Sequence, residues 1–128
     1  MQATSLRMGK KSEHSEQVAL FNWAKWQART IPELHLLFAI PNGGLRHIRV
    51  AQKLKAEGVK SGVPDVFLPI PKNGFHGLWI EMKYGKNKVT DNQDWWLKEL
   101  KSEGYECAVC YGYEPAKSVI LDYLEMKK

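Results

Sequence analysis

The stretch HGLWIEMKYG, residues 76–85, has the pattern of a central β-strand, and the rest of the chain can be arranged around it. Apolar residues alternate here with Trp79, Glu81 and Lys83, so an extended backbone places the carboxylate and the ammonium on one face. Glu and Lys are poor strand formers and are rarely buried unless they are paired. The simplest explanation is an exposed salt bridge at a sheet edge, and the remaining sequence must show whether a functional site explains the pair better.

The length and charge of the chain limit its fold and its partners. A chain of 128 residues is large enough for one domain with its own hydrophobic core. Its formal net charge of +5 suggests an anionic partner, of which nucleic acid is the commonest. No signal-peptide pattern and no membrane-spanning apolar run is present, so we expect a cytoplasmic protein without a membrane partner.

Hydrophobic periodicity and turn residues predict the order of the elements. Residues 1–11 are polar and basic and should form a flexible arm, and residues 12–128 should form a single domain. Helices are predicted over residues 12–29, 46–57, 90–104 and 114–128, and strands over residues 34–40, 65–70, 78–83 and 106–111. The expected fold is α/β, with a small mixed β-sheet flanked by helices on both faces.

A short loop joins the strand of Asp65 to the strand of Glu81, so these two strands should pair antiparallel. In that pairing Asp65, at the start of one strand, comes opposite the far end of the other, where Glu81 and Lys83 lie. The preceding Pro64 constrains the bend that aims the backbone of Asp65. Three charged groups are therefore expected to meet at one end of the sheet.

Such a group of charges fits a site for a hard divalent cation. The carboxylates of Asp65 and Glu81 would supply oxygen ligands, which suit Mg²⁺ or Mn²⁺, and the ion would cancel their mutual repulsion. Lys83, next to the ion, can orient or deprotonate an attacking water and stabilise charge on phosphoryl oxygens. An anionic phosphodiester substrate would then match the basic charge of the chain.

Other polar positions have two explanations each. Glu16 lies near the start of the first helix on its apolar stripe, with Glu13 one turn earlier, and both acids would also complement the helix dipole. Gln93 begins the apolar stripe of a later helix, and it also completes a capping box with Thr90. The pattern alone leaves both explanations open for these residues.

Basic residues gather on one side of the second helix, opposite its apolar residues. Cations in line beside a Gly-rich turn suit a phosphate backbone, although a solvated helix face is the simpler explanation. The residues expected to bind nucleic acid are Arg46, Arg49, Lys53 and Lys60.

Other catalytic arrangements find little support. The sequence has no nucleophile elbow for a Ser-His-Asp triad and no phosphate-binding loop for a nucleotide cofactor, and its histidines lack metal-ligand spacing. Cys107 and Cys110 form a C-x-x-C, but residues three apart in a strand face opposite ways, and no second ligand pair completes a zinc site. We expect both cysteines to be buried and reduced.

Two long runs resemble the VRR-NUC family of the PD-(D/E)XK nuclease superfamily, and the resemblance covers most of the chain from Ser12 onwards. The runs are NGGLRHIRVAQKLKAEGVKSGVPDVFLPI and HGLWIEMKYGKNKVTDNQDWWLKELKSEGY. Four motifs in this order carry the resemblance, namely Glu16-Gln17, Gly62-Val63-Pro64-Asp65, Glu81-Met82-Lys83 and Gln93.

The resemblance implies a restriction-endonuclease-like core and Mg²⁺- or Mn²⁺-dependent cleavage of phosphodiester bonds. By similarity, Asp65 and Glu81 would bind the metal with help from the main-chain carbonyl of Met82. Glu16 would complete the acidic shell from the first helix, and Glu13 remains a rival for that role.

The same resemblance assigns roles to two further residues. Lys83 would assist the water nucleophile, and Gln93 would face the scissile phosphate or the metal-bound water. Stand-alone members of the family, from phages and bacteria, are small homodimers that cut branched DNA such as four-way (Holliday) junctions. We therefore expect a homodimeric endodeoxyribonuclease in the cytoplasm of a bacterium or a phage-infected host.

Two other functions remain as alternatives to this expectation. The first is a DNA-binding protein without catalysis, which would rest on the overall charge and the basic second helix. Acidic residues close to a phosphate backbone count against it, because binding alone gains nothing from them. The second is a restriction-like endonuclease that cuts at a defined base sequence, for which the chain is small.

Overall fold

The computed structural model describes residues 11–41 and 48–125, and the structural statements that follow refer to these two ranges. Several predicted features lie outside the described residues: the arm over residues 1–10, the Gly-rich turn, Arg46 and the last three residues of the chain. None of the helices in the described ranges is long and apolar enough to cross a lipid bilayer.

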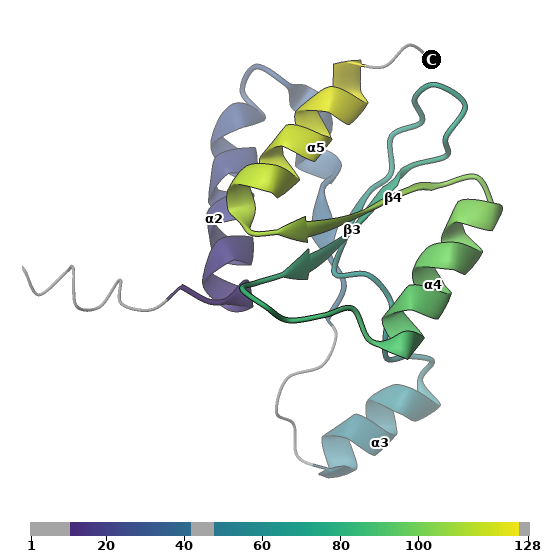
Figure 1. The fold of residues 1–128 in the computed structure, drawn as a ribbon. Helices are drawn as coiled ribbons and strands as arrows, with labels where there is room; N and C mark the ends of the chain where they lie inside the picture. Colours follow the sequence, from purple (N-terminus) through teal and green to yellow (C-terminus); the bar gives the residue numbers. More distant parts are fainter. Residues whose placement is uncertain (1–10, 42–47, 126–128) are drawn as a thin grey trace, which may run out of the picture.

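A four-stranded mixed sheet lies at the centre of the fold, in the order β1-β2-β3-β4 (Figure 1). Its strands are β1 (Phe38–Ala39), β2 (Val66–Leu68), β3 (Leu78–Lys83) and β4 (Glu106–Tyr111). The pairs β1–β2 and β2–β3 are antiparallel, whereas β4 runs parallel to β3. Helix α4 (Asp91–Ser102) makes the crossover that a parallel pair requires. The mixed sheet and the antiparallel pairing of β2 with β3 confirm the predictions from sequence.

Helices cover the two faces of this sheet. Helices α2 (Glu13–Gln27) and α5 (Tyr113–Glu125) pack together on one face, while α4 covers the other face (Figure 1). Helix α3 (Ile48–Ala56) lies at the periphery, apart from the α2–α5 pair (Figure 1). The predicted α/β architecture with helices on both faces is therefore confirmed.

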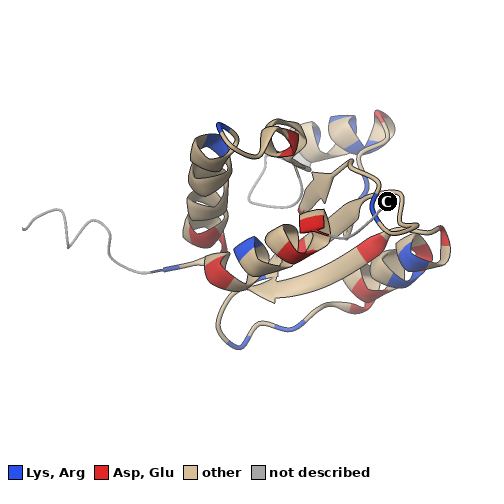
Figure 2. Ribbon diagram, turned by 90° about the horizontal axis from the view of Figure 1, so that it is seen from above, with Lys and Arg blue, Asp and Glu red and all other residues tan. Residues whose placement is uncertain are grey.

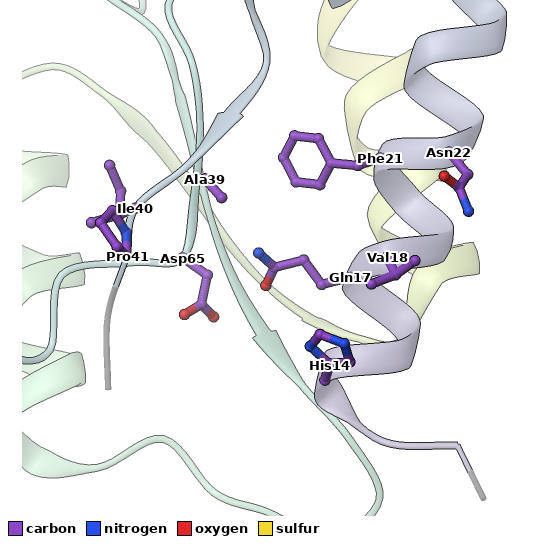
Figure 3. A pocket seen from close by; sticks show the side chains of 9 residues that line it. All are labelled: His14, Gln17, Val18, Phe21, Asn22, Ala39, Ile40, Pro41 and Asp65. Carbon is purple, nitrogen blue, oxygen red and sulfur yellow. The ribbon is translucent and has the colours of Figure 1, made fainter. Parts of the chain in front are cut away.

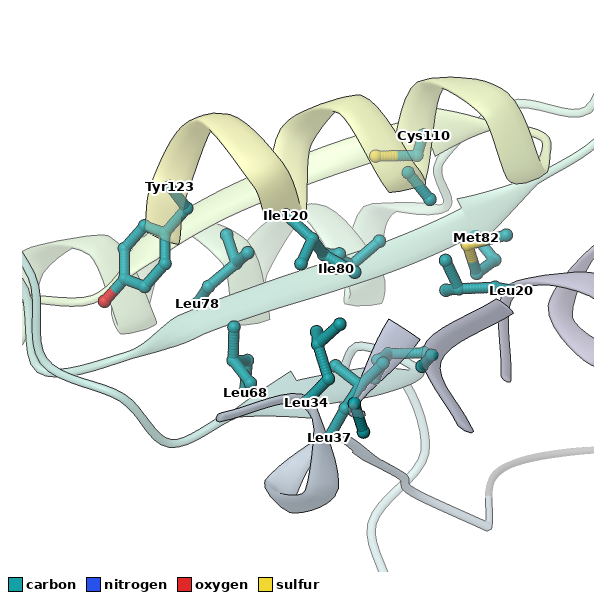
Figure 4. Close-up of a cluster of buried hydrophobic side chains, with 14 residues drawn as sticks. Leu20, Leu34, Leu37, Leu68, Leu78, Ile80, Met82, Cys110, Ile120 and Tyr123 are labelled. Atoms are coloured by element: carbon teal, nitrogen blue, oxygen red, sulfur yellow. The ribbon is translucent and has the colours of Figure 1, made fainter. Parts of the chain in front are cut away.

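The hydrophobic core lies between the sheet and the α2–α5 layer (Figure 4). Its fully buried members from β3 and α5 are Leu78, Ile80, Met82, Ala116, Ile120 and Tyr123. Because side chains alternate along a strand, this packing turns Glu81 and Lys83 to the opposite face of β3. A slip of one residue would drive both charges into the core, so burial fixes the register of this strand.

The strand predicted over residues 34–40 is wrong for most of its length. The 3₁₀-helix η1 (Pro32–Leu36) occupies its first part, and only the two residues of β1 follow as a strand. Pro32 favours this outcome, because its fixed φ and missing N–H suit the first turn of a helix. Leu34 and Leu37 are both buried, and a spacing of three residues places them on one side of a 3₁₀ turn.

The two cysteines of β4 are buried, as predicted, and neither forms a disulfide. Burial raises the pKa of the Cys107 thiol and of the Cys110 thiol to about 11 in each case. Both side chains therefore stay protonated near neutral pH and serve as packing groups, since only a thiolate is a good nucleophile or metal ligand.

Candidate active site

The β2–β3 hairpin brings Asp65 next to the C-terminal end of β3, where Glu81 and Lys83 lie. A carboxylate oxygen of Asp65, Oδ2, accepts a hydrogen bond of 2.8 Å from the backbone N–H of Met82. The main chain is anchored as well, because the carbonyl of Asp65 accepts a hydrogen bond of 2.7 Å from the N–H of Ile40. These two hydrogen bonds, one to the side chain and one to the main chain, hold the Asp65 side chain near Glu81. Each of the two acids affects the pKa of the other.

Glu81 is a buried acid with only one of its oxygens near a cation. Its side chain is 2% exposed, and its Oε2 lies 3.8 Å from the Nζ of Lys83. The other oxygen, Oε1, is buried and has no hydrogen-bond partner among the described residues. An unpaired buried carboxylate oxygen is costly, and this atom is therefore the strongest indication that the site accepts a further group.

The pKa values of Asp65 and Glu81 also indicate that the site accepts a cation. Burial raises the pKa of Glu81 to about 8, repulsion from Asp65 adds to the increase, and the ammonium of Lys83 opposes it. Burial also raises the pKa of Asp65, against the hydrogen bond from the Met82 N–H, which lowers it. Two carboxylates so close together cannot both ionise cheaply without a nearby cation.

A divalent cation fits this donor set. Asp65 and Glu81 offer hard carboxylate oxygens, and the unpaired Oε1 of Glu81 is one that an ion would satisfy. Within residues 11–41 and 48–125 no three His, Cys, Asp or Glu side chains are arranged as a complete metal-binding group. The remaining ligands would come from the main chain, water or substrate phosphate, as is common for Mg²⁺, which keeps several waters and few protein ligands.

The two acids of the first helix lie in different environments. Glu16 accepts, through Oε1, a hydrogen bond of 2.8 Å from the N–H of Tyr113 at the start of α5. Its carboxylate is thus engaged by the positive end of that helix. Glu13, in contrast, raises the pKa of both Asp65 and Glu81 by its negative charge. Of the two acids, Glu13 is thus the one whose charge acts on the acid pair, and the role of either acid at the metal remains a prediction.

Glu13 is held in place by Asn87, a residue for which the sequence predicts no role. Its Oε2 accepts a hydrogen bond of 2.9 Å from the side-chain amide of Asn87, in the loop after β3. A single Asn in a polar loop gives no signal in one sequence, because the contact joins residues that are 74 positions apart.

Gln93 forms the predicted capping box at the start of α4. Its Oε1 accepts a hydrogen bond of 2.9 Å from the N–H of Thr90, and the Thr90 hydroxyl accepts one of 3.1 Å from the N–H of Gln93. The capping role is therefore confirmed. It uses only the oxygen of the side-chain amide, so the amide nitrogen can still donate, and the contact with phosphate remains a prediction.

Helix α4 also holds the bend that precedes Asp65. The carbonyl of Ser61 accepts hydrogen bonds of 2.9 Å from the Asn92 amide and of 3.1 Å from the Trp96 indole N–H. Gly62 follows with a φ of +88°, and a Cβ added there would lie 2.6 Å from the Asn92 amide nitrogen. Glycine is therefore required at this bend, which leads directly into the site.

Three of the four predicted nucleic-acid-binding residues are described, and all three are exposed. Arg49 and Lys53 belong to α3 and are exposed, as is Lys60 after that helix, and Arg46 lies outside the described residues. Figure 2 shows Lys and Arg interspersed with Asp and Glu over several elements. Lys86 and Lys88 are exposed and lie in the loop directly after Lys83, close in sequence to the site. Neither residue is among those predicted from the sequence to bind nucleic acid.

Comparisons with known proteins agree with the fold and identify the family. The family model of the VRR-NUC domain matches residues 6–114. A solved structure described as a VRR_NUC domain protein is similar to this chain, with a TM-score of 0.80 and 30% sequence identity, and the alignment covers 93% of each chain. The comparison with curated proteins finds no match. A four-stranded mixed sheet, an Asp and a Glu-x-Lys at one end of it, and these two matches together place the chain in the VRR-NUC family of nuclease domains.

Proposed function

We propose that this nuclease is an endodeoxyribonuclease that hydrolyses phosphodiester bonds with Mg²⁺ or Mn²⁺ and prefers branched DNA such as four-way junctions. The observation that supports the metal dependence is the pair of half-buried Asp65 and buried Glu81, with Oε1 of Glu81 unpaired among the described residues and the pKa of Glu81 raised to about 8. A protein that only bound DNA would gain nothing from two acids held this close to each other near a phosphate backbone.

The residues of the site divide the work as follows. When bound, the divalent cation supplies Lewis-acid stabilisation of phosphoryl charge and lowers the pKa of water. Asp65 and Glu81 would hold it, with the Met82 carbonyl and, from the first helix, Glu13 in preference to Glu16. By holding the cation, these residues would fix the position of the reacting phosphate. Catalysis would then come mainly from orientation and charge.

Lys83 and Gln93 act on the substrate itself. Lys83 is buried, and its Nζ is held 3.8 Å from Glu81, so it can donate a hydrogen bond to the attacking water or to a phosphoryl oxygen. Gln93 can donate from the amide nitrogen that its capping contact leaves unused. Lys83 lies in the sheet itself and Gln93 on helix α4, which packs against β4, so both groups have limited movement during the reaction.

The preference for branched DNA and the homodimer belong to the same proposal. Symmetric cutting of a two-fold junction needs two active sites related by two-fold symmetry, which a homodimer supplies. The exposed basic residues Arg49, Lys53 and Lys60, together with Arg46, would hold the DNA arms by their phosphates. We place the enzyme in the cytoplasm of a bacterium or a phage-infected host, where such DNA forms.

Cleavage assays test this function directly. Labelled duplex, flap and four-way junction DNA are incubated with the protein and Mg²⁺, Mn²⁺ or EDTA, and products are resolved on denaturing gels. We expect metal-dependent cuts near the branch point and their loss in Lys83→Ala and Asp65→Ala. Matched controls are Lys25→Ala and Asp122→Ala, which remove exposed residues of the same types outside the acid pair and should cut as the parent does.

Each component of the proposal has its own contrary result. Tight binding of junctions in Mn²⁺ without any strand scission would indicate a binding protein. Cuts at one base sequence on unrelated duplexes would indicate a restriction-like enzyme. A monomer in sedimentation experiments, both alone and with junction DNA, would exclude the homodimer without touching the catalytic assignment.

A further inference from the structure

A cleft of about 510 Å³ opens beside Asp65, between α2 and the segment that ends β1 (Figure 3). Its α2 wall consists of His14, Gln17, Val18, Phe21 and Asn22, and its opposite wall of Ala39, Ile40, Pro41 and Asp65. The α2 residues recur at spacings of three and four, so they form one stripe along the helix. The cleft therefore extends from Asp65, one of the two acids of the candidate site, along α2.

The chemistry of the described walls favours an uncharged ligand. No Lys or Arg lines the cleft in the described part of the chain, and its one acidic residue, Asp65, would repel an anion. The side-chain amides of Gln17 and Asn22 offer both donors and acceptors, and neither amide is engaged with another described residue. Such amides can read the donor and acceptor edge of a flat heterocycle.

The apolar part of the cleft has the form of a stacking surface. The ring of Phe21 points from α2 toward the cleft, and Ile40 and Pro41 lie across from the helix (Figure 3). Phe21 is half-buried, so part of the ring remains open to a ligand. Stacking of a base on an aromatic side chain contributes about 1–3 kcal/mol, whatever the base.

We propose that this cleft binds one unstacked nucleobase of the DNA, from a nucleotide next to the scissile phosphate. The inference rests on the proposed nuclease function and specifies how the enzyme selects its substrate. Phe21 stacks on the base, and Gln17, whose amide lies on the Asp65 side of the cleft in Figure 3, binds the edge of the base. A volume of about 510 Å³ is within the usual range of small-molecule sites, roughly 300–1,000 Å³.

This assignment explains a preference for branched DNA without a dedicated junction-shaped surface. A base must leave the helical stack to enter the cleft, and unstacking costs a few kcal/mol in regular duplex but less where pairing is already disturbed. Branch points, flaps and mismatches supply such nucleotides. Cleavage should therefore follow the ease of unstacking at one position beside the cut.

Equilibrium binding to abasic DNA tests the cleft independently of catalysis. In the Lys83→Ala background, each nucleotide at the branch point of a four-way junction is replaced in turn by an abasic site, and affinity is measured by fluorescence anisotropy in Mn²⁺. We expect one position at which loss of the base weakens binding about 10-fold, which corresponds to about 1.4 kcal/mol. In Gln17→Ala and Phe21→Leu this difference between intact and abasic DNA should shrink to nearly nothing.

Two further measurements keep the test decisive. Phe21 also packs against the core, so thermal melting must show that Phe21→Leu is folded, whereas the side-chain amide of Gln17 has no hydrogen-bond partner to lose among the described residues. Trp26→Leu is the matched control, because Trp26 is an aromatic residue of the same helix that lies outside the cleft and is 65% exposed. It should keep the full 10-fold difference.

The outcomes separate the two proposals. If no abasic position weakens binding, or if the weakening is the same in the parent background, Gln17→Ala and Phe21→Leu, the cleft does not bind a base. If the unmutated protein binds junctions with this base dependence but cuts no DNA in any metal, the proposed function fails while the base site stands. Cleavage without base dependence removes the cleft proposal alone.

Discussion

The side-chain amide of Asn87 donates a hydrogen bond of 2.9 Å to the carboxylate of Glu13 and so connects the loop after β3 to the start of α2. The backbone of Asn87 is held at the same time, because its carbonyl accepts a hydrogen bond of 2.8 Å from the Tyr111 hydroxyl at the end of β4. Glu13 in turn acts on the pKa values of Asp65 and Glu81. Three segments thus jointly orient one acid toward the candidate metal site.

Replacement of Asn87 by Ala should weaken metal binding, because Glu13 loses the partner that orients its carboxylate. Removal of a hydrogen bond to a ligating group costs on the order of 10-fold in metal affinity. Titration calorimetry with Mn²⁺ measures the effect, and Lys86→Ala, a change at an exposed neighbour in the same loop, is the control. An unchanged Mn²⁺ affinity in Asn87→Ala would show that the contact with Glu13 has no role in the site.

The two acids of α2 should separate in their effects. Glu13→Gln should reduce Mn²⁺ affinity and leave the melting temperature almost unchanged, since Glu13 lies near the acid pair and its partner Asn87 is exposed. Glu16→Ala should lower stability by about 1–2 kcal/mol, because the N-terminus of α5 loses the carboxylate that accepts from Tyr113. The reverse pattern, with metal affinity lost only in Glu16→Ala, would restore Glu16 as the metal-site acid.

The stability of the metal-free protein should fall as the pH rises. The pKa of Glu81 lies at about 8 in the folded protein, against an ordinary value of 4.5, so the folded state binds the proton more tightly than the unfolded state. The resulting stabilisation is fully present below pH 4.5 and is lost progressively up to about pH 8.

Thermal melts in EDTA across this pH range measure the effect. Glu81→Gln carries no titrating group at that position and should show a clearly smaller decrease in melting temperature. The raised pKa of Asp65 acts in the same direction and contributes to the decrease that remains in this variant. Equal pH profiles for the parent and Glu81→Gln would mean that Glu81 is ionised in the metal-free protein.

Gly62→Ala should disturb the site through the bend before Asp65. A Cβ there would lie 2.6 Å from the Asn92 amide and would also be strained by the φ of +88°. Gly58→Ala is a matched control, since its φ of +102° carries similar strain while nothing lies within 4 Å of an added Cβ.

Both glycine variants should lose about 1–3 kcal/mol of stability from the backbone strain. Only Gly62→Ala should also bind Mn²⁺ more weakly, because its bend must shift away from Asn92 and α4. Chemical denaturation and Mn²⁺ titration measure the two quantities. Equal Mn²⁺ affinity in both variants would show that the bend does not control the position of Asp65.

Local periodicity is sufficient to predict the core of the site. The alternation of apolar and charged residues in β3 places Glu81 and Lys83 together on the face away from the hydrophobic core, and the short hairpin brings Asp65 to them. These relations depend on the two-residue repeat of a strand and on loop length, both of which are visible in one sequence.

The failure over residues 34–40 has an equally local cause. A short apolar run does not distinguish a strand from a helical turn, and Pro32 decided in favour of the 3₁₀-helix η1. The capping box of Gln93 was predicted correctly because both partners lie within one helical turn.

The sequence by itself determined the mixed α/β fold and the meeting of Asp65, Glu81 and Lys83, because strand alternation, helix periodicity and turn residues are short-range properties of the chain. Only the tertiary structure decided which partners Glu13 and Glu16 contact, since both acids lie on the same side of one helix but one accepts from Asn87 and the other from Tyr113. That choice depends on how α2 packs beside β3 and α5, as do the contact with Asn87 and the cleft at Phe21. Such contacts join residues distant in sequence, and their geometry follows from packing of the whole core.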